Sequence, residues 1–124
     1  MTESKNKILV VDDSSTNTFL LESFLKGKGY NIITTQSGEE ALSILKKEKI
    51  DLLLLDIMMP EISGFDILEE IEKDKNLKDI KIILISVLER EKRIDEILEN
   101  KNIDYVQKPI ILNDLIFKIN NFLN

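Results

Sequence analysis

The chain has 124 residues, is 43% hydrophobic and 32% charged, and carries a formal net charge of −6 at pH 7. It contains no cysteine and no histidine. This excludes disulfides, thiolate or imidazole metal sites, and nucleophilic machinery built on Ser–His or Cys–His pairs. The acidic balance weighs against nucleic acid as a direct ligand.

The length and composition fit one globular domain, so we expect residues 1–124 to form a single unit with its own core. Residues 1–7 contain no apolar stretch typical of a leader peptide. No apolar run approaches the roughly 20 residues that a membrane-spanning helix needs. We therefore expect a cytoplasmic protein that makes no contact with a membrane.

Five short apolar or β-branched runs have the length and composition of strands. In chain order they are Lys7–Val11, Asn31–Thr35, Ile50–Asp56, Ile80–Ile85 and Ile103–Val106. The third run contains four consecutive leucines, which cannot show one face to water and hide the other. It is therefore predicted to be a central strand covered on both faces, as in a parallel sheet.

The segments between these runs have apolar residues at helical spacing. The predicted helices run from Ser14 or Ser15 to about Lys28, from Ser37 to about Lys47, from Ser63 to the polar stretch at Lys73, from about Arg90 to Asn100, and from about Leu112 to Leu123. The second is expected to start with a capping box between Ser37 and Glu40. Strands alternating with helices predict parallel βαβ units with right-handed crossovers.

The inner faces of these helices follow from the same spacing. Side chains expected to be buried include Leu20, Leu21, Phe24 and Leu25 in the first helix and Leu112, Leu115, Ile116, Ile119 and Leu123 in the last. The fourth helix carries few apolar residues, so its cover over the sheet is expected to be thin.

Polar side chains stand where four of the predicted strands end. Asp12 and Asp13 follow the first strand, Asp56 ends the third, Ser86 follows the fourth, and Lys108 follows the fifth. In a parallel sheet these ends share one edge. If the first and third strands are neighbours, about 4.8 Å apart, two or three carboxylates crowd one spot.

Like charges 4 Å apart repel by about 4 kcal/mol at an effective dielectric near 20, so protonation or a cation must relieve this crowding. A set of oxygen ligands predicts a hard divalent ion, most simply Mg²⁺. A carboxylate nucleophile at Asp56 beside Mg²⁺, Lys108 and the Ser86 hydroxyl has the parts needed for phosphoryl transfer. The predicted product is an aspartyl phosphate.

Four motifs, in order and at matching separations, now carry a family resemblance. They are Val10-Val11-Asp12-Asp13, Leu54-Leu55-Asp56-Ile57-Met58-Met59-Pro60 with Gly64 beyond, Ile85-Ser86, and Asp104-Tyr105 followed by Lys108-Pro109. Over essentially its whole length the chain resembles the receiver domain of bacterial two-component response regulators. The resemblance implies a flavodoxin-like α/β fold, a single doubly wound parallel sheet of five strands in the order 2-1-3-4-5 with five helices.

The resemblance also implies a metal site. Asp56 matches the phosphoacceptor, Asp13 would bind Mg²⁺ directly, and Asp12 would bind it mostly through water. The backbone carbonyl of Met58 would be the third protein ligand, so the Met58 side chain should matter little to the metal.

The same resemblance implies a switch. Ser86 would bond a phosphoryl oxygen, and Lys108 would pair with the phosphoryl group next to a cis Lys108–Pro109 bond. Tyr105 would turn inward as Ser86 moves toward the phosphate. The face formed by the fourth helix, the fifth strand and the fifth helix would then change its affinity for partners.

The implied phosphoryl donor is a sensor histidine kinase or a histidine phosphotransfer protein. The implied output is an unidentified partner or output domain. A second copy of the chain, in a homodimer formed on phosphorylation, is a further expected partner. The domain is not expected to be an enzyme in the usual sense, because it would catalyse only its own phosphorylation and dephosphorylation.

Three other functions fit parts of this pattern. A receiver-like domain that signals without phosphate is disfavoured because all five polar site residues are present. A Mg²⁺-dependent phosphatase with an aspartyl nucleophile needs a second acid where Met58 stands. An FMN carrier needs a hydroxyl-rich phosphate loop, and the Asp12–Asp13 pair that precedes Ser14 and Ser15 would repel phosphate.

The chain departs from the family pattern at four positions. Val87 stands where the family usually has a small residue, and we expect it to slow attack at Asp56. Lys101 and Ile103 replace a frequent Gly and Asp, and Ile111 replaces a frequent N-cap Asp. We expect these last three to alter helix ends near the partner surface and to leave the acidic site unchanged.

Overall fold

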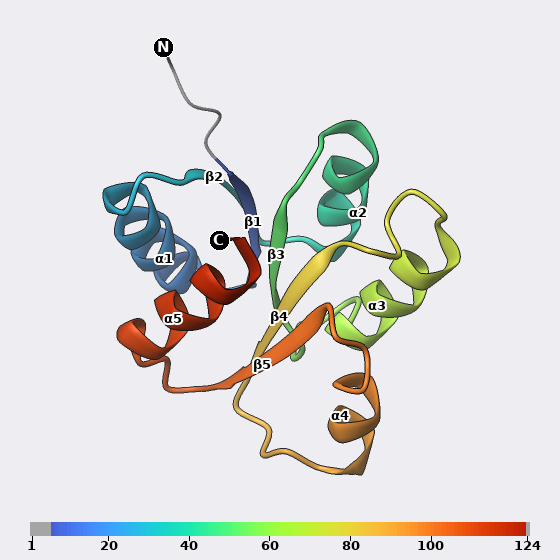
Figure 1. Ribbon diagram of the computed structural model, residues 1–124. Coiled ribbons are helices and arrows are strands. Elements are labelled where there is room, and N and C mark those ends of the chain that lie inside the picture. The colour runs from blue at the N-terminus through green and yellow to red at the C-terminus, as the bar shows by residue number, and fades with distance from the viewer. Residues whose placement is uncertain (1–5, 124) are drawn as a thin grey trace.

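A central sheet of five parallel strands organises the computed structural model, which describes residues 6–123 (Figure 1). The strands are β1 (Lys7–Val11), β2 (Asn31–Thr35), β3 (Leu52–Asp56), β4 (Lys81–Ser86) and β5 (Ile103–Gln107). Their order in the sheet is β2-β1-β3-β4-β5, and every neighbouring pair is parallel. The predicted fold class, a doubly wound α/β sheet of flavodoxin-like order, is therefore confirmed.

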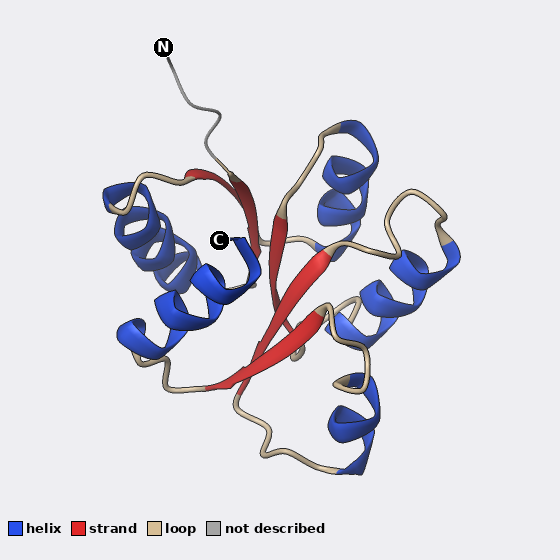
Figure 2. Ribbon diagram, in the orientation of Figure 1, coloured by secondary structure: helices blue, strands red, loops and turns tan. Residues whose placement is uncertain are grey.

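Helices cover both faces of this sheet (Figure 2). They are α1 (Ser15–Gly27), α2 (Gly38–Lys47), α3 (Gly64–Lys73), α4 (Lys92–Ile97) and α5 (Leu112–Leu123). In Figure 1, α1 and α5 lie on the left face, and α2, α3 and α4 lie on the right face. Within residues 6–123, no helix is long and apolar enough to span a bilayer. The expectation of no leader peptide rests mainly on residues 1–5, which lie outside the described part.

The leucine run behaves as the sequence predicts. Leu52, Leu53, Leu54 and Leu55 are all fully buried. Leu53 and Leu55 pack in the core shared with α2, α3 and α4, while Leu52 and Leu54 pack in the core shared with α1 and α5. Burying each such side chain contributes about 1.5–3 kcal/mol, so β3 is the structural centre from which Asp56 emerges.

Serine caps begin two helices in ways that differ from the prediction. The Ser37 hydroxyl accepts a hydrogen bond from the Glu40 backbone N–H, as expected. The prediction of the reciprocal capping bond is wrong, because the Glu40 carboxylate accepts a hydrogen bond from the Thr35 hydroxyl instead. The complete capping box lies at α3, between Ser63 and Asp66.

Two predicted core leucines are on the surface. Leu20 is 57% exposed and Leu112 is 41% exposed. In α1 the inner face is taken by Leu21 and Leu25, which are four residues apart, and Leu20 lies a full 100° around the helix from Leu21. Leu112 is the first residue of α5, before the inward row that begins at Leu115.

The fourth helix is shorter than predicted. It spans only Lys92–Ile97, where the sequence predicts a helix from Arg90 to Asn100. Its N-cap residue, Glu91, makes no side-chain capping bond, and Ile94 is its one fully buried residue. The predicted thin cover over the sheet is confirmed.

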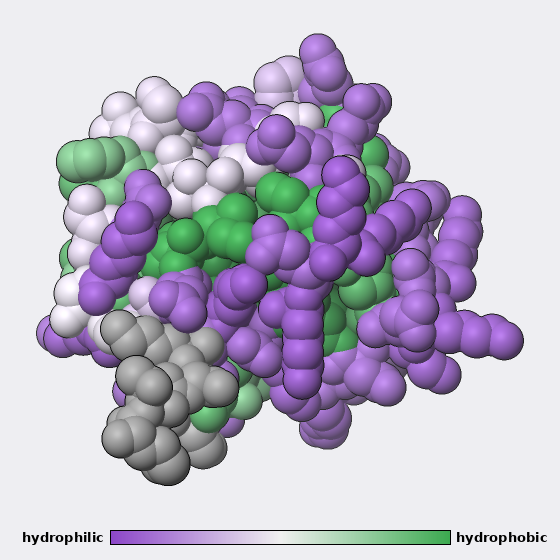
Figure 3. Space-filling view, turned by 90° about the horizontal axis from the view of Figure 1, so that it is seen from above, coloured by the Kyte–Doolittle hydropathy of each residue, from purple (hydrophilic) through white to green (hydrophobic). Residues whose placement is uncertain are grey.

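Lysines stand in the last turns of three helices. Lys26, Lys46, Lys47 and Lys73 stand in the last turns of α1, α2 and α3. Helices that return against parallel strands end at the edge where the strands begin, and cations there complement the helix dipole. Seen from above Figure 1, the surface is mostly hydrophilic, with a narrower hydrophobic strip (Figure 3).

Gly64, the first residue of α3, generates a testable prediction. A Cβ at this position would lie 2.7 Å from Ile57 Cα and 2.8 Å from the Asp56 carbonyl oxygen. Because both atoms belong to the backbone, they cannot move aside cheaply. We expect Gly64→Ala to lower the free energy of unfolding by about 1–3 kcal/mol in urea titrations, although alanine is the better helix former.

The matched control is Gly27→Ala at the end of α1, where a Cβ would meet nothing within 4 Å. That variant should be neutral or slightly stabilising. Equal effects of the two substitutions would contradict the close packing at Gly64.

Candidate functional site

The carboxyl ends of β1, β3 and β5 bring the predicted polar residues together. Carboxylate oxygens of Asp12, Asp13 and Asp56 lie within 4.8 Å of one another. Asp12 and Asp56 are buried, while Asp13 is exposed. The parallel register that places Val10 beside Leu54 sets the separation of these strand ends.

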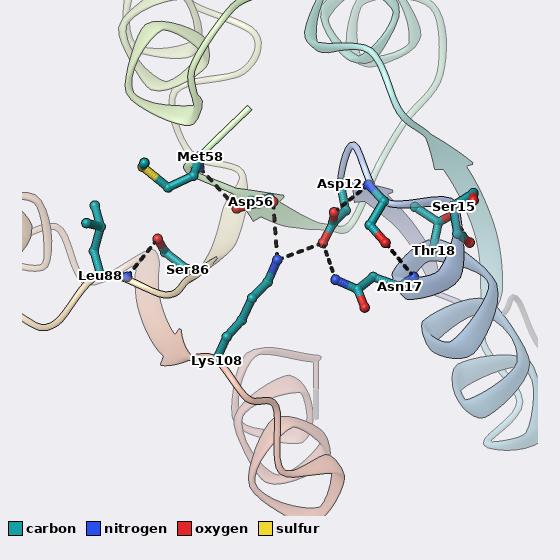
Figure 4. A network of polar contacts seen from close by, with 10 residues as sticks. Asp12, Ser15, Asn17, Thr18, Asp56, Met58, Ser86, Leu88 and Lys108 are labelled. Atoms are coloured by element: carbon teal, nitrogen blue, oxygen red, sulfur yellow. Dashed lines mark hydrogen bonds and ion pairs between the residues drawn. The ribbon is translucent and has the colours of Figure 1, made fainter. Parts of the chain in front are cut away.

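Lys108 lies between two of the carboxylates (Figure 4). Its Nζ is 3.2 Å from Asp12 Oδ2 and 3.3 Å from Asp56 Oδ2. The Lys108 side chain is 19% exposed and each carboxylate side chain is 4% exposed, so these ion pairs are poorly screened by solvent. One ammonium group thus serves two buried carboxylates.

The surroundings act on the pKa of both charged partners. Burial raises the pKa of Asp56, and the charge of Asp12 raises it further. The Met58 backbone N–H, which donates to Asp56 Oδ1 at 3.0 Å, and Lys108 oppose this shift without cancelling it. For Lys108, burial lowers the pKa, but Asp12 and Asp56 together outweigh it and raise the pKa above its ordinary value.

The donor set fits a hard divalent cation. All three clustered ligands are carboxylates, and a single ammonium contacts two of them. The ionised cluster therefore keeps an excess of negative charge that a cation such as Mg²⁺ would neutralise. Asp13 is the exposed member, so the cluster is open to solvent on its side.

Met58 and Ser86 flank the cluster differently. The Met58 side chain is 53% exposed, and only its backbone N–H contacts Asp56. Ser86 is fully buried, and its Oγ accepts a hydrogen bond from the Leu88 backbone N–H at 3.1 Å. In Figure 4 the Ser86 hydroxyl points to Leu88 and not to Asp56.

Tyr105 is buried in this structure. It is 7% exposed, and its hydroxyl has no hydrogen-bond partner among the described residues. Burial raises the pKa of Tyr105. The sequence-based expectation was an inward Tyr105 when Ser86 faces a phosphate, whereas here Tyr105 is inward while Ser86 faces Leu88. The implied cis Lys108–Pro109 bond is confirmed.

The sequence reasoning missed Asn17. Its Nδ2 donates to Asp12 Oδ2 at 3.3 Å, from the first turn of α1. The sequence feature that could have identified Asn17 is its amide side chain in the first helical turn after the Asp12–Asp13 pair. Val87, which departs from the family pattern, is 62% exposed directly after Ser86.

Fold and site together define the class of this protein. It is a doubly wound α/β domain with a carboxylate cluster and a lysine at the carboxyl edge of its sheet. The family model described as the response regulator receiver domain matches residues 8–120. The chain therefore belongs to this family, the receiver domains of two-component response regulators, which are signalling switches.

Relatives and solved structures agree with this assignment. The chain is 37% identical over 116 residues to response regulator SaeR of Staphylococcus aureus, an alignment that covers 94% of this chain and 50% of that protein. The chain thus spans about half the length of the curated relatives it matches.

Among solved structures, response regulator TrrA from Thermotoga maritima in complex with Mg²⁺-BeF is 37% identical, with a TM-score of 0.79 over 94% of this chain and 98% of that one. The chemotaxis protein CheY4 of Vibrio cholerae is 23% identical, with a TM-score of 0.87 over 96% of this chain and 99% of that one. The likeness to CheY4 shows the fold alone.

The raised pKa of Asp56 predicts that removing its charge increases the stability of the fold, by an amount that depends on pH. Because folding raises this pKa, ionised Asp56 destabilises the metal-free fold. The penalty is absent below the unfolded pKa of about 3.9 and is complete above the raised folded pKa. In EDTA, Asp56→Asn should therefore unfold at higher urea than the native protein at pH 7, and this advantage should vanish as the pH falls below about 3.9.

The control is Asp79→Asn, which changes an exposed carboxylate between α3 and β4. It should shift the urea midpoint little at any pH. A native protein more stable than Asp56→Asn at pH 7 would show that Lys108 more than compensates for burial.

Proposed function

We propose that this domain is a phosphorylation-dependent switch that accepts a phosphoryl group on Asp56. The observation that supports this most directly is a buried carboxylate of raised pKa, clustered with Asp12 and Asp13 and in contact with Lys108. The donor would be a phosphohistidine on a sensor kinase or a phosphotransfer protein. The domain would catalyse only its own phosphorylation and dephosphorylation.

In the proposed transfer, a carboxylate oxygen of Asp56 forms a bond to phosphorus as the phosphorus–nitrogen bond of the donor breaks. The donor imidazole leaves with the electron pair and takes up a proton from solvent. Lys108, already in contact with Asp56, would move its ammonium onto a phosphoryl oxygen. Mg²⁺ held by Asp12, Asp13, Asp56 and the Met58 carbonyl would supply further positive charge to the phosphoryl oxygens.

The switch would run from Ser86 to Tyr105. To bond a phosphoryl oxygen, the Ser86 hydroxyl must leave the Leu88 N–H, which it contacts now. That step would move the loop after β4. The charged residues Glu89 to Glu91 of this loop influence the pKa of Tyr105. We propose that the face of α4, β5 and α5 then changes its affinity for an output partner, an output domain or a second copy of the chain.

The phosphoacceptor is tested by intact-mass analysis after incubation with a small acyl phosphate and Mg²⁺. We expect one labile phosphoryl adduct on the native protein and none on Asp56→Asn, because Asp56 is the carboxylate that we propose as the acceptor. The adduct should also be absent in EDTA.

A control variant, Asp51→Asn at the opposite edge of the sheet, should be phosphorylated normally. If neither the acyl phosphate nor a phosphohistidine donor gives an adduct, the phosphate-independent receiver is the better reading. An adduct that persists in Asp56→Asn would place the acceptor elsewhere.

Val87 generates a separate kinetic prediction. Its branched side chain is 62% exposed next to Ser86, where it would restrict access to the phosphoryl group. Val87→Ala should speed both phosphorylation by the acyl phosphate and loss of the phosphoryl group by several-fold, as followed by intact mass over time. Phe117→Ala, which trims an exposed side chain on α5, should leave both rates unchanged. Unchanged rates in Val87→Ala would dismiss the gating role.

A further inference from the structure

Asp12 is held by three donors, of which only Lys108 is charged. Its Oδ1 accepts from the Ser14 backbone N–H at 2.9 Å. Its Oδ2 accepts from Lys108 Nζ at 3.2 Å and from Asn17 Nδ2 at 3.3 Å. Because a carboxylate only accepts hydrogen bonds, the contacting atom of Asn17 must be its amide nitrogen.

Asn17 closes a ring of hydrogen bonds at the start of α1. The Asn17 backbone N–H donates to Ser14 Oγ at 3.2 Å, and the Ser14 backbone N–H donates to Asp12. The helix start is thus capped through the backbone of Asn17, and its side chain is not needed for that purpose. The side-chain amide is directed at Asp12 (Figure 4).

The lysine that shares Asp12 Oδ2 with Asn17 has a second carboxylate partner. Lys108 Nζ also contacts Asp56, at 3.3 Å. An aspartyl phosphate at position 56 carries more negative charge than the free carboxylate of Asp56, so it would draw Lys108 away from Asp12. Asn17 contacts Asp12 and not Asp56, so it would stay bonded to Asp12 in either case, and as a neutral donor it does not repel a cation.

We infer that Asn17 is a positioning residue, which fixes the orientation of the Asp12 carboxylate so that the cluster binds a divalent cation whichever partner Lys108 takes. This inference rests on the proposed function, because it concerns the Mg²⁺ that the transfer would use. Partners that orient a metal-binding group usually matter by about tenfold or more in affinity.

The test is Mg²⁺ titration of the folded protein, followed by NMR or calorimetry, for the native chain, Asn17→Ala and Asn17→Leu. The leucine variant keeps the volume and removes the donor. Both variants should raise the Mg²⁺ dissociation constant by roughly tenfold. Ser23→Ala, a polar-to-alanine change at an exposed site on the same helix, should not.

If the role of Asn17 is purely structural, its substitution would lower the urea midpoint in EDTA and leave the Mg²⁺ dissociation constant of the folded protein unchanged. That result would overturn the inference. Mg²⁺ binding by the native chain with unchanged affinity in both Asn17 variants would overturn the inference alone. Failure of the native chain itself to bind Mg²⁺ would overturn the inference together with the proposed metal-dependent function.

Discussion

Electrostatic crowding at the carboxyl edge of the sheet is the constraint on which the rest of the structure depends. Carboxylate oxygens of Asp12, Asp13 and Asp56 lie within 4.8 Å of one another. Two carboxylates about 4 Å apart repel by about 4 kcal/mol at an effective dielectric near 20, and solvent reduces this for the exposed Asp13. The two ion pairs that Lys108 makes with Asp12 and Asp56 oppose this repulsion, and β3, which carries Asp56, is packed on both faces. Such a cluster responds strongly to any added cation.

The polar contacts around the cluster divide into two groups. Lys108, Asn17 and the Met58 N–H all donate to Asp12 or Asp56, and they hold the carboxylates in place. Ser86 and Tyr105 do not take part in this set. The Tyr105 hydroxyl is buried and has no hydrogen-bond partner within residues 6–123, and a buried hydroxyl left unpaired costs about 1–3 kcal/mol. The flanking helix α4 is short, and Ile94 is its one buried residue.

The sequence predicts the strands and the acidic cluster well for a shared physical reason. A run such as Leu52–Leu55 is only stable when covered on both faces, and parallel strands align their carboxyl ends, so Asp12, Asp56 and Lys108 lie at one edge of the sheet. The order of the strands came from the family resemblance, because hydrophobic pattern alone does not fix which strands are neighbours. The exposed Leu20 shows a similar limit, since helical spacing indicates a face but not its width.

Side-chain hydrogen bonds were the least predictable feature, because they depend on tertiary neighbours. Glu40 bonds Thr35 rather than the cap it was expected to complete, and Asn17 bonds Asp12 across a helix start. This matters for the proposed chemistry. A phosphoryl group carries about −1.5 to −2 charges in place of the carboxylate's −1, so it increases the repulsion that the cluster already bears. The proposed phosphorylated state would therefore depend on Lys108 and a cation more strongly than the resting state does. Neutral donors that orient the carboxylates without competing for that cation are then the contacts that a stable phosphorylated state requires.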